Sequence, residues 1–340
     1  MLSALRFGTT AWGNPTPAMP NTLQEQLVKH LTDVHSIEEQ AIVQMRRARR
    51  IAGDPRLAHI FELHLGETEV HEERVRNRLQ ALGAEPSRVK DAAGKAGGIG
   101  MIWFAKLNPD TPGKLAAHAY SYEHMELAAY QLLEHLAKRA DDEETASIAA
   151  EIAAEEAAMA ERLEDNFDLV VEASLRDLDP NDIGSQLDNY IADAHALENQ
   201  SVALLQGGQR IAGDPPLKKI FEDHLAETRG HKRRLEERLE ARGSSPSRLR
   251  DAALYASGLG AGGFFAAQPD TPGKLAGFAF AFEHIEAAGY ELLRRVAERA
   301  GDSETAEAAK SILLEERSMA KRVRERFDEA LAAAIADNVG

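Results

Sequence analysis

The sequence predicts an all-α protein made of two tandem four-helix bundles. Ala, Leu, Glu and Arg dominate the 340 residues and β-branched residues are sparse, which favours helix. Residues 50–55 (Arg-Ile-Ala-Gly-Asp-Pro) recur as 210–215, and residues 109–116 recur as 269–276, both at an offset of 160. A repeat of this length is too long for a solenoid unit and indicates a duplicated domain.

Each copy divides into four long helices and one long bridge. In the first copy we expect helices over 22–51, 55–82, 111–140 and 142–172, with a glycine-rich bridge over 83–111 that begins with a short helix at Pro86. Gly53 can end the first helix in left-handed geometry, Asp54 can cap the second helix and Asp142 can cap the fourth. Short turns within each pair and a long bridge between the pairs predict the one-crossover topology of ferritin-like bundles.

Composition and the positions of helix-ending residues suggest the domain boundaries. We expect a flexible tail over 1–21, a first bundle over 22–177, a linker over 178–181 and a second bundle over 182–336. No apolar run reaches the roughly 18 residues that span a bilayer, and the first 20 residues lack the apolar core of a secretory signal. A cytoplasmic location is therefore predicted.

Charge and cysteine content limit the partners and cofactors. The net charge of −16 argues against nucleic acid and anionic membranes as partners. The chain has no cysteine, which excludes thiolate metal sites and iron–sulfur clusters. Any bound metal must be held by carboxylate and imidazole groups, which suit iron, manganese or zinc.

Candidate metal ligands occur on every expected helix, at matching positions in the two copies. Glu123 and Glu126 lie one turn apart on a largely apolar helix, and Glu67 and His71 lie one turn apart on the preceding helix. Carboxylates from four helices would repel one another in a dry core unless two divalent cations neutralised them. The predicted ligands are Glu38, Glu67, His71, Glu123, Glu126 and Glu156 in the first copy and Glu198, Glu227, His231, Glu283, Glu286 and Glu316 in the second.

These motifs resemble the ferritin-like proteins of the YciF type, which are found in bacterial stress responses. The resemblance rests on Glu-Thr-x-x-His over 67–71 and 227–231, on Glu-His-x-Glu-x-Ala-x-Tyr over 123–130, repeated as 283–290 with Gly289 at its penultimate position, and on paired glutamates at 155–156 and 315–316. The pair Glu123 and Glu126 is also similar to the rubrerythrin arrangement. The resemblance implies two iron ions per bundle, with manganese or zinc as other choices, and a role in handling iron with O2 or H2O2 during stress protection.

Met159 and Met319 stand where the fourth helix of ferritin-like proteins usually supplies a histidine. We therefore expect about one histidine per site and mainly oxygen ligands. Tyr130 and Tyr290 are the predicted catalytic residues, as electron donors or as hydrogen-bond partners of a ligand, with a purely structural core role as the alternative.

Two further questions stay open from the sequence. A ferroxidase or peroxidase-like activity competes with a non-enzymatic stress scaffold, in which the buried glutamates would be protonated or paired. A closed storage cage is harder to build from a tandem chain. We also expect the two copies to pair within the chain as a pseudo-two-fold dimer.

Overall fold

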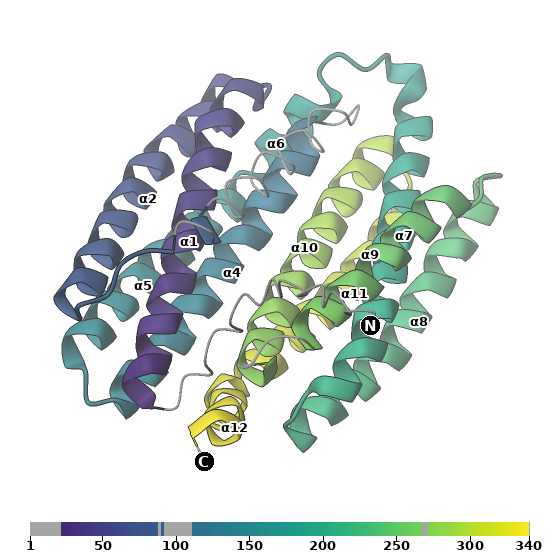
Figure 1. Cartoon of the computed structure of the whole chain (residues 1–340). Coiled ribbons are helices and arrows are strands. Elements are labelled where there is room, and N and C mark those ends of the chain that lie inside the picture. Colours follow the sequence, from purple (N-terminus) through teal and green to yellow (C-terminus); the bar gives the residue numbers. More distant parts are fainter. Residues whose placement is uncertain (1–21, 88–89, 92–110, 267–270, 340) are drawn as a thin grey trace, which may run out of the picture.

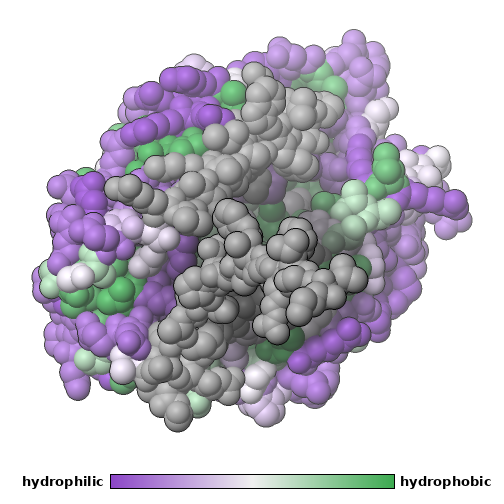
Figure 2. Space-filling model, in the orientation of Figure 1, coloured by the Kyte–Doolittle hydropathy of each residue, from purple (hydrophilic) through white to green (hydrophobic). Residues whose placement is uncertain are grey.

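The computed structural model describes residues 22–87, 90–91, 111–266 and 271–339, and the regular elements among these residues are all helical (Figure 1). The predicted tail over 1–21 and most of the first glycine-rich bridge lie outside the described residues. Among the helices that are described, none has an apolar stretch long enough to cross a bilayer. Figure 2 shows a face on which hydrophilic residues predominate over the described surface, in keeping with the net charge of −16.

Four long helices form each bundle. The first bundle contains α1 (Leu23–Ile51), α2 (Pro55–Ala81), α4 (Thr111–Arg139) and α5 (Glu143–Asp165). The second bundle contains α7 (Ile183–Ile211), α8 (Pro215–Ala241), α10 (Thr271–Ala300) and α11 (Ser303–Arg324). In each bundle the first and fourth long helices both pack on the second and the third, so the four helices enclose one core. The all-α prediction with two tandem bundles is confirmed.

The turn between α1 and α2 follows the predicted chemistry and also positions α4. Gly53 has a φ of +73°, the left-handed conformation that glycine adopts without strain. Asp54 caps α2, because its Oδ1 accepts a hydrogen bond from the backbone N–H of Arg56 at 2.8 Å. A Cβ atom on Gly53 would lie 2.9 Å from Cγ of Pro112, so this glycine also permits the close approach of the first turn of α4.

The fourth helix is broken in both copies, which differs from the single helix expected over 142–172. In the first copy α5 is followed by α6 (Phe167–Leu175), and in the second α11 is followed by α12 (Phe327–Val339). At the first break, the Asn166 side chain donates to the backbone carbonyl of Arg162 at 2.8 Å. The reason for the bend is tertiary packing: Phe167 and Val170 are buried as α6 packs on α4 and α10.

A 3₁₀ turn, η1 (Pro180–Asp182), leads from the first bundle into α7.

The bridge of the second copy contains a longer helix than expected. After α8, helix α9 (Arg248–Ala266) covers 19 residues and packs along α7. The crossover is therefore attached to the bundle that it spans.

The two bundles contact each other through α4 and α10, which lie side by side in the middle of the molecule (Figure 1). Positions that are 160 residues apart meet there. The Ser121 hydroxyl donates to the backbone carbonyl of Ala281 at 2.7 Å, and the rings of His124 and His284 stack with centroids 3.4 Å apart. Such self-complementary contacts are typical of a two-fold interface.

Ion pairs across this interface are also reciprocal. Lys274 of the second bundle lies 2.9 Å from the Asp33 carboxylate of the first, and Lys114 of the first lies 2.5 Å from the Asp193 carboxylate of the second. The two pairs correspond when the copies are exchanged, because Lys114 and Lys274 are 160 positions apart and so are Asp33 and Asp193. The neighbouring lysines lower the pKa of Asp33, against the opposing effect of its burial, so this carboxylate stays charged.

A double-mutant cycle between Asp33→Asn and Lys274→Met tests this docking in solution. We expect a coupling of about 0.5–1 kcal/mol in the free energy of unfolding, reduced by added salt, because the pair is only partly exposed. Chemical denaturation of the four proteins measures it. The control cycle replaces Lys274→Met by Lys138→Met, since Lys138 pairs with Glu134 of its own helix and should show no coupling to Asp33. Equal couplings in both cycles would contradict the docked arrangement.

Candidate metal centre

In the first bundle, four ionisable side chains converge from three helices. His64 comes from α2, Glu123 and Glu126 come from α4, and Glu156 comes from α5, and all four are buried. Each offers one ligand atom, and these atoms lie within 4.8 Å of one another. His64 Nε2 is 2.9 Å from a Glu123 oxygen and 3.5 Å from a Glu156 oxygen. We call these residues the four-residue group.

A second group lies next to the first and shares one residue with it. Glu38 from α1, His71 from α2 and Glu156 place their ligand atoms within the same 4.8 Å limit, and we call them the three-residue group. Glu156 Oε1 lies 2.8 Å from His71 Nδ1, while its other oxygen faces His64. One carboxylate therefore stands between two histidines, as a bridging ligand does in a two-metal site.

The second bundle repeats the arrangement. Its four-residue group is His224, Glu283, Glu286 and Glu316, and its three-residue group is Glu198, His231 and Glu316. Glu316 Oε2 lies 3.2 Å from His224 Nε2 and Glu316 Oε1 lies 2.7 Å from His231 Nδ1. The two copies differ on their surfaces but have the same arrangement of buried candidate ligands.

Carboxylates outside the groups orient the histidines. His64 Nδ1 donates to Glu67 Oε2 at 2.9 Å, and His71 Nε2 donates to Glu155 Oε2 at 2.5 Å. When such an imidazole is neutral, its proton stays on the outward ring nitrogen, and the inner nitrogen can offer its lone pair to a cation at the acidic centre. This is the usual outer support of histidine metal ligands.

Glu67 and Glu227 are placed differently from the sequence prediction. The structure brings neither into a ligand group. Each lies half-buried against the outer nitrogen of its histidine, and Glu67 also faces Arg162 at 3.4 Å, while Glu227 faces Arg322 at 3.0 Å. The His64 and Arg162 contacts together lower the pKa of Glu67 to about 2, so it remains an anion.

The histidine content of the site also differs from the expectation of about one per bundle. His64 joins the four-residue group and His71 joins the three-residue group. The two are seven residues apart, which is about two helical turns, so they project from the same face of α2. That spacing was the available sequence signal for His64. The methionines at 159 and 319 are buried in the core and belong to neither ligand group.

The two tyrosines lie within reach of a candidate ligand in each copy. The hydroxyl groups of Tyr130 and Tyr290 donate to Glu38 Oε1 and Glu198 Oε1 respectively, and both rings are buried. Burial, together with the adjacent glutamates, raises the pKa of both phenols well above its usual range. Each tyrosine therefore remains protonated and orients its glutamate.

The residues present fit a pair of cations. Among the described residues, hydrogen-bond partners are lacking for Glu38 Oε2, His64 Nε2, His71 Nδ1 and both oxygens of Glu123, Glu126 and Glu156. A buried polar group left in this way costs about 1–3 kcal/mol, and a charged one costs more. Four carboxylates and two neutral histidines carry a charge of −4, which two divalent ions would balance.

Burial and mutual repulsion hold protons on the site when no cation is present. Burial is the largest cause for Glu38, whose pKa rises to about 8, and for Glu123, whose pKa rises to about 7. The pKa of Glu126 rises well above its usual range, because burial acts together with Glu156 and the other carboxylates. Burial lowers the pKa of His71, but the neighbouring carboxylates raise it to about 9. Cations must therefore displace protons to bind.

Among the residues that the structure describes, a third group occurs in the first bundle and has no counterpart in the second. His35, Glu39 and Glu72 offer ligand atoms within 4.8 Å of one another, but both ring nitrogens of His35 already have partners, Asp91 and Glu72. In the second bundle the positions of Glu39 and Glu72 are occupied by Asn199 and Lys232. This group does not share the unpartnered atoms of the internal site.

Comparison with known families matches both halves of the chain. The family model described as "Domain of unknown function (DUF892)" matches residues 22–176 and again residues 186–336. Each match contains one complete set of the internal ligand groups.

The metal-free protein should lose stability as the pH rises from about 5 to 8. The folded-state pKa values of Glu38, Glu123 and His71 lie above their unfolded values, so the folded state binds more protons across this range. The stability from these groups is present at low pH and is lost as the pH passes the raised values. We expect the Tm to fall by roughly 5–10 °C, measured by thermal melts in chelator-treated buffer.

Saturating Mn(II) provides the control for this pH dependence. Because the cation replaces the bound protons, the Tm should then be higher at pH 8 than that of the metal-free protein, and the decline should disappear. A metal-free Tm that stays level or rises between pH 5 and 8 would be inconsistent with the raised pKa values.

Proposed function

The chain belongs to the DUF892 family through both of its halves, and from this premise we propose that it is a ferritin-like di-metal carboxylate protein of the YciF type, with iron as the metal. In this proposal each bundle holds two ions and handles iron together with O2 or peroxide in stress protection. The pairing of the two bundles as an intramolecular pseudo-dimer is part of the same proposal, supported by the reciprocal contacts of α4 and α10.

One observation carries the proposal. Glu156 and Glu316 each point one oxygen at each of two buried histidines. Around them, several carboxylate oxygens have no hydrogen-bond partner among the described residues: Glu38 Oε2 and both oxygens of Glu123 and Glu126 in the first bundle, and Glu198 Oε2, Glu283 Oε2 and Glu286 Oε1 in the second. A structural ion-pair network would instead satisfy these atoms with donors. Lone pairs that converge from four helices are what a bridged pair of cations requires.

The chemistry of the donor set favours iron. In each bundle four carboxylates and two imidazoles give an oxygen-rich site, which suits iron and manganese and stabilises the oxidised form of iron. A bound iron pair would supply two electrons to O2 or peroxide. The chain itself contributes burial that excludes water, histidines fixed by Glu67 and Glu155, and a protonated Tyr130 that holds Glu38 in place.

Metal content after loading with Fe(II) and desalting tests the site directly. We expect close to two ions per bundle, and Glu156→Ala should remove both ions of the first bundle because this carboxylate contacts both histidines. Combined Glu156→Ala and Glu316→Ala should leave almost none. The matched control is Glu151→Ala, an exposed acid on the same helix that pairs with Arg74. Equal metal content in all four proteins, by elemental analysis, would remove the basis of the proposal. Anomalous scattering at the iron and manganese edges identifies the metal.

The alternative of a non-enzymatic scaffold differs from the metal-site proposal in the effect that added metal should have on the Tm. Glu123→Gln combined with Glu126→Gln should raise the Tm of the metal-free protein, because it removes two buried acids that repel their neighbours. If a metal site is the function, the same variant should also lose most of the stabilisation that Mn(II) gives to the first bundle. If instead the unaltered protein gains no stability from metal, the scaffold interpretation prevails.

A further inference from the structure

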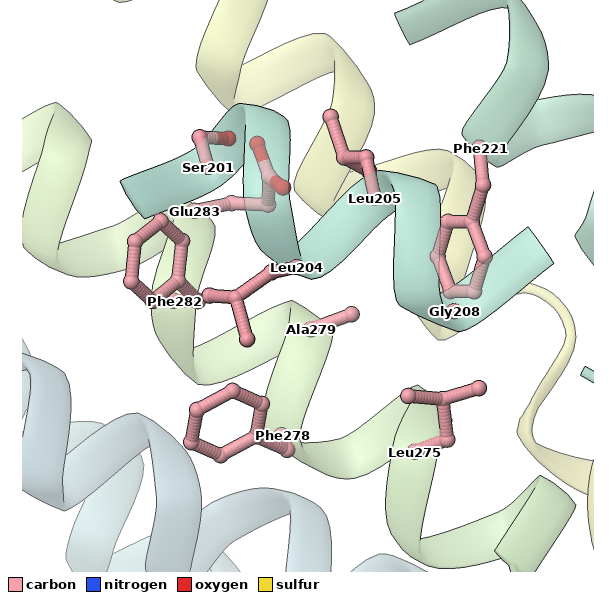
Figure 3. Close-up of a pocket in the computed structure, with 10 residues that line it drawn as sticks. All are labelled: Ser201, Leu204, Leu205, Gly208, Phe221, Leu275, Phe278, Ala279, Phe282 and Glu283. Atoms are coloured by element: carbon pink, nitrogen blue, oxygen red, sulfur yellow. The ribbon is translucent and has the colours of Figure 1, made fainter. Parts of the chain in front are cut away.

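A small cavity lies beside the metal groups of the second bundle, between α7 and α10 (Figure 3). Its volume is about 20 Å³, which is room for one small molecule. Ser201 and Glu283 lie at one end of the lining, and Gly208 and Phe221 lie at the other. Gly208 follows Ser201 by seven residues, so the lining extends about 10 Å along α7, and it includes the candidate metal ligand Glu283 at the Ser201 end.

The lining selects against water. Apart from Ser201 and Glu283, the side chains around the cavity are hydrocarbon, including those of Leu204, Leu275 and Phe282. The Ser201 hydroxyl already donates to Glu286 at 3.4 Å. A water molecule needs two to four polar partners, and apolar cavities of this kind take apolar guests instead. The guest that fits this volume and lining is a small apolar molecule, of which O2 is the one relevant to the proposed chemistry.

The first bundle has the same candidate metal ligands, but the residues equivalent to the cavity lining are different. The positions of Leu204, Phe278 and Phe282 are occupied there by polar side chains, and that of Gly208 by alanine: the first-bundle residues are Gln44, His118, Tyr122 and Ala48. The Tyr122 hydroxyl donates to the backbone carbonyl of Ile37 at 3.0 Å. The two copies therefore keep the metal groups and differ along the approach to them.

We propose that the second bundle contains a binding pocket for O2 that opens onto Glu283, and that Gly208 keeps it open, so that the two metal sites of one chain differ in their access to O2. The biological role of this pocket rests on the proposed function, whereas O2 binding itself can be measured without metal. A Cβ atom on Gly208 would lie 3.2 Å from two ring carbons of Phe221, tight enough to move the ring. The first bundle has Ala48 and Phe61 at the equivalent positions, both buried, so Gly208→Ala is compatible with folding.

Methyl NMR of the metal-free full-length chain under O2 pressure, compared with the same pressure of N2, measures the binding. Dissolved O2 is paramagnetic and relaxes the methyl groups that it contacts. Leu275 and Leu115 are equivalent positions in the two bundles and are equally buried, at 6% exposure each, which makes Leu115 the internal control. We expect the relaxation enhancement of Leu275 to exceed that of Leu115 by about threefold or more, as a dry cavity concentrates an apolar guest.

Variants distinguish a loss of O2 binding in the pocket from a general effect of substitution on the relaxation enhancement. Gly208→Ala should bring the enhancement at Leu275 down to that of Leu115, and Leu204→Gln, which copies the first bundle, should do the same. Gly230→Ala makes the same change on α8 and should have no effect, because within the described part of the chain an added Cβ atom would approach one atom, Nη2 of the flexible Arg233 side chain, at 3.8 Å. Equal enhancement at Leu275 and Leu115, or an unchanged enhancement in Gly208→Ala, would overturn the proposal. Because the protein is metal-free, this result is independent of whether metal binding is found.

Discussion

The structure depends on one electrostatic constraint: four carboxylates of each bundle are buried against one another and must be neutralised. Glu38, Glu123, Glu126 and Glu156 are each essentially without solvent exposure. Full ionisation of such a cluster without cations would cost more than the folded state of an ordinary domain can supply. Protons can satisfy the constraint at low pH and cations can satisfy it at neutral pH, so the residues that are expected to make the bundle pH-sensitive are the same ones that form the candidate metal site.

Much of the fold was predictable because its signals are local. Gly53 and Asp54 act within one turn of where they stand, and the 160-residue repeat doubles every such signal. The break at Asn166 was not predictable in this way. No proline or glycine marks it, and the chain bends because Phe167 and Val170 bury themselves against α4 and the other bundle. Packing between distant segments decided that boundary, and sequence periodicity alone does not contain it.

The sequence predicted most of the residues that gather at the candidate site, but it did not predict which of them contribute ligand atoms and which only support a ligand. Spacing identifies the face of a helix but does not say how far a side chain reaches toward the axis. His64 and Glu67 are one turn apart on α2, and either could have pointed inward. The structure places His64 in the four-residue group and leaves Glu67 outside it, where it is held by Arg162 from α5. That choice depends on a partner 95 residues away, which is information that a single helix does not hold.

Duplication allows this chain to do what a symmetric dimer of identical bundles could not. Two copies in one chain can keep the ligands and diverge elsewhere, as the approach to each site has done. Their contact surface has diverged too. Arg317 of the second bundle pairs with Glu164 of the first, and under the proposed pseudo-two-fold the equivalent of Glu164 is Arg324. Two second bundles docked in this way would bring Arg317 against Arg324 and repel, so the surface chemistry favours pairing of unlike copies. A covalent link between the bundles then supplies that partner at a high effective concentration.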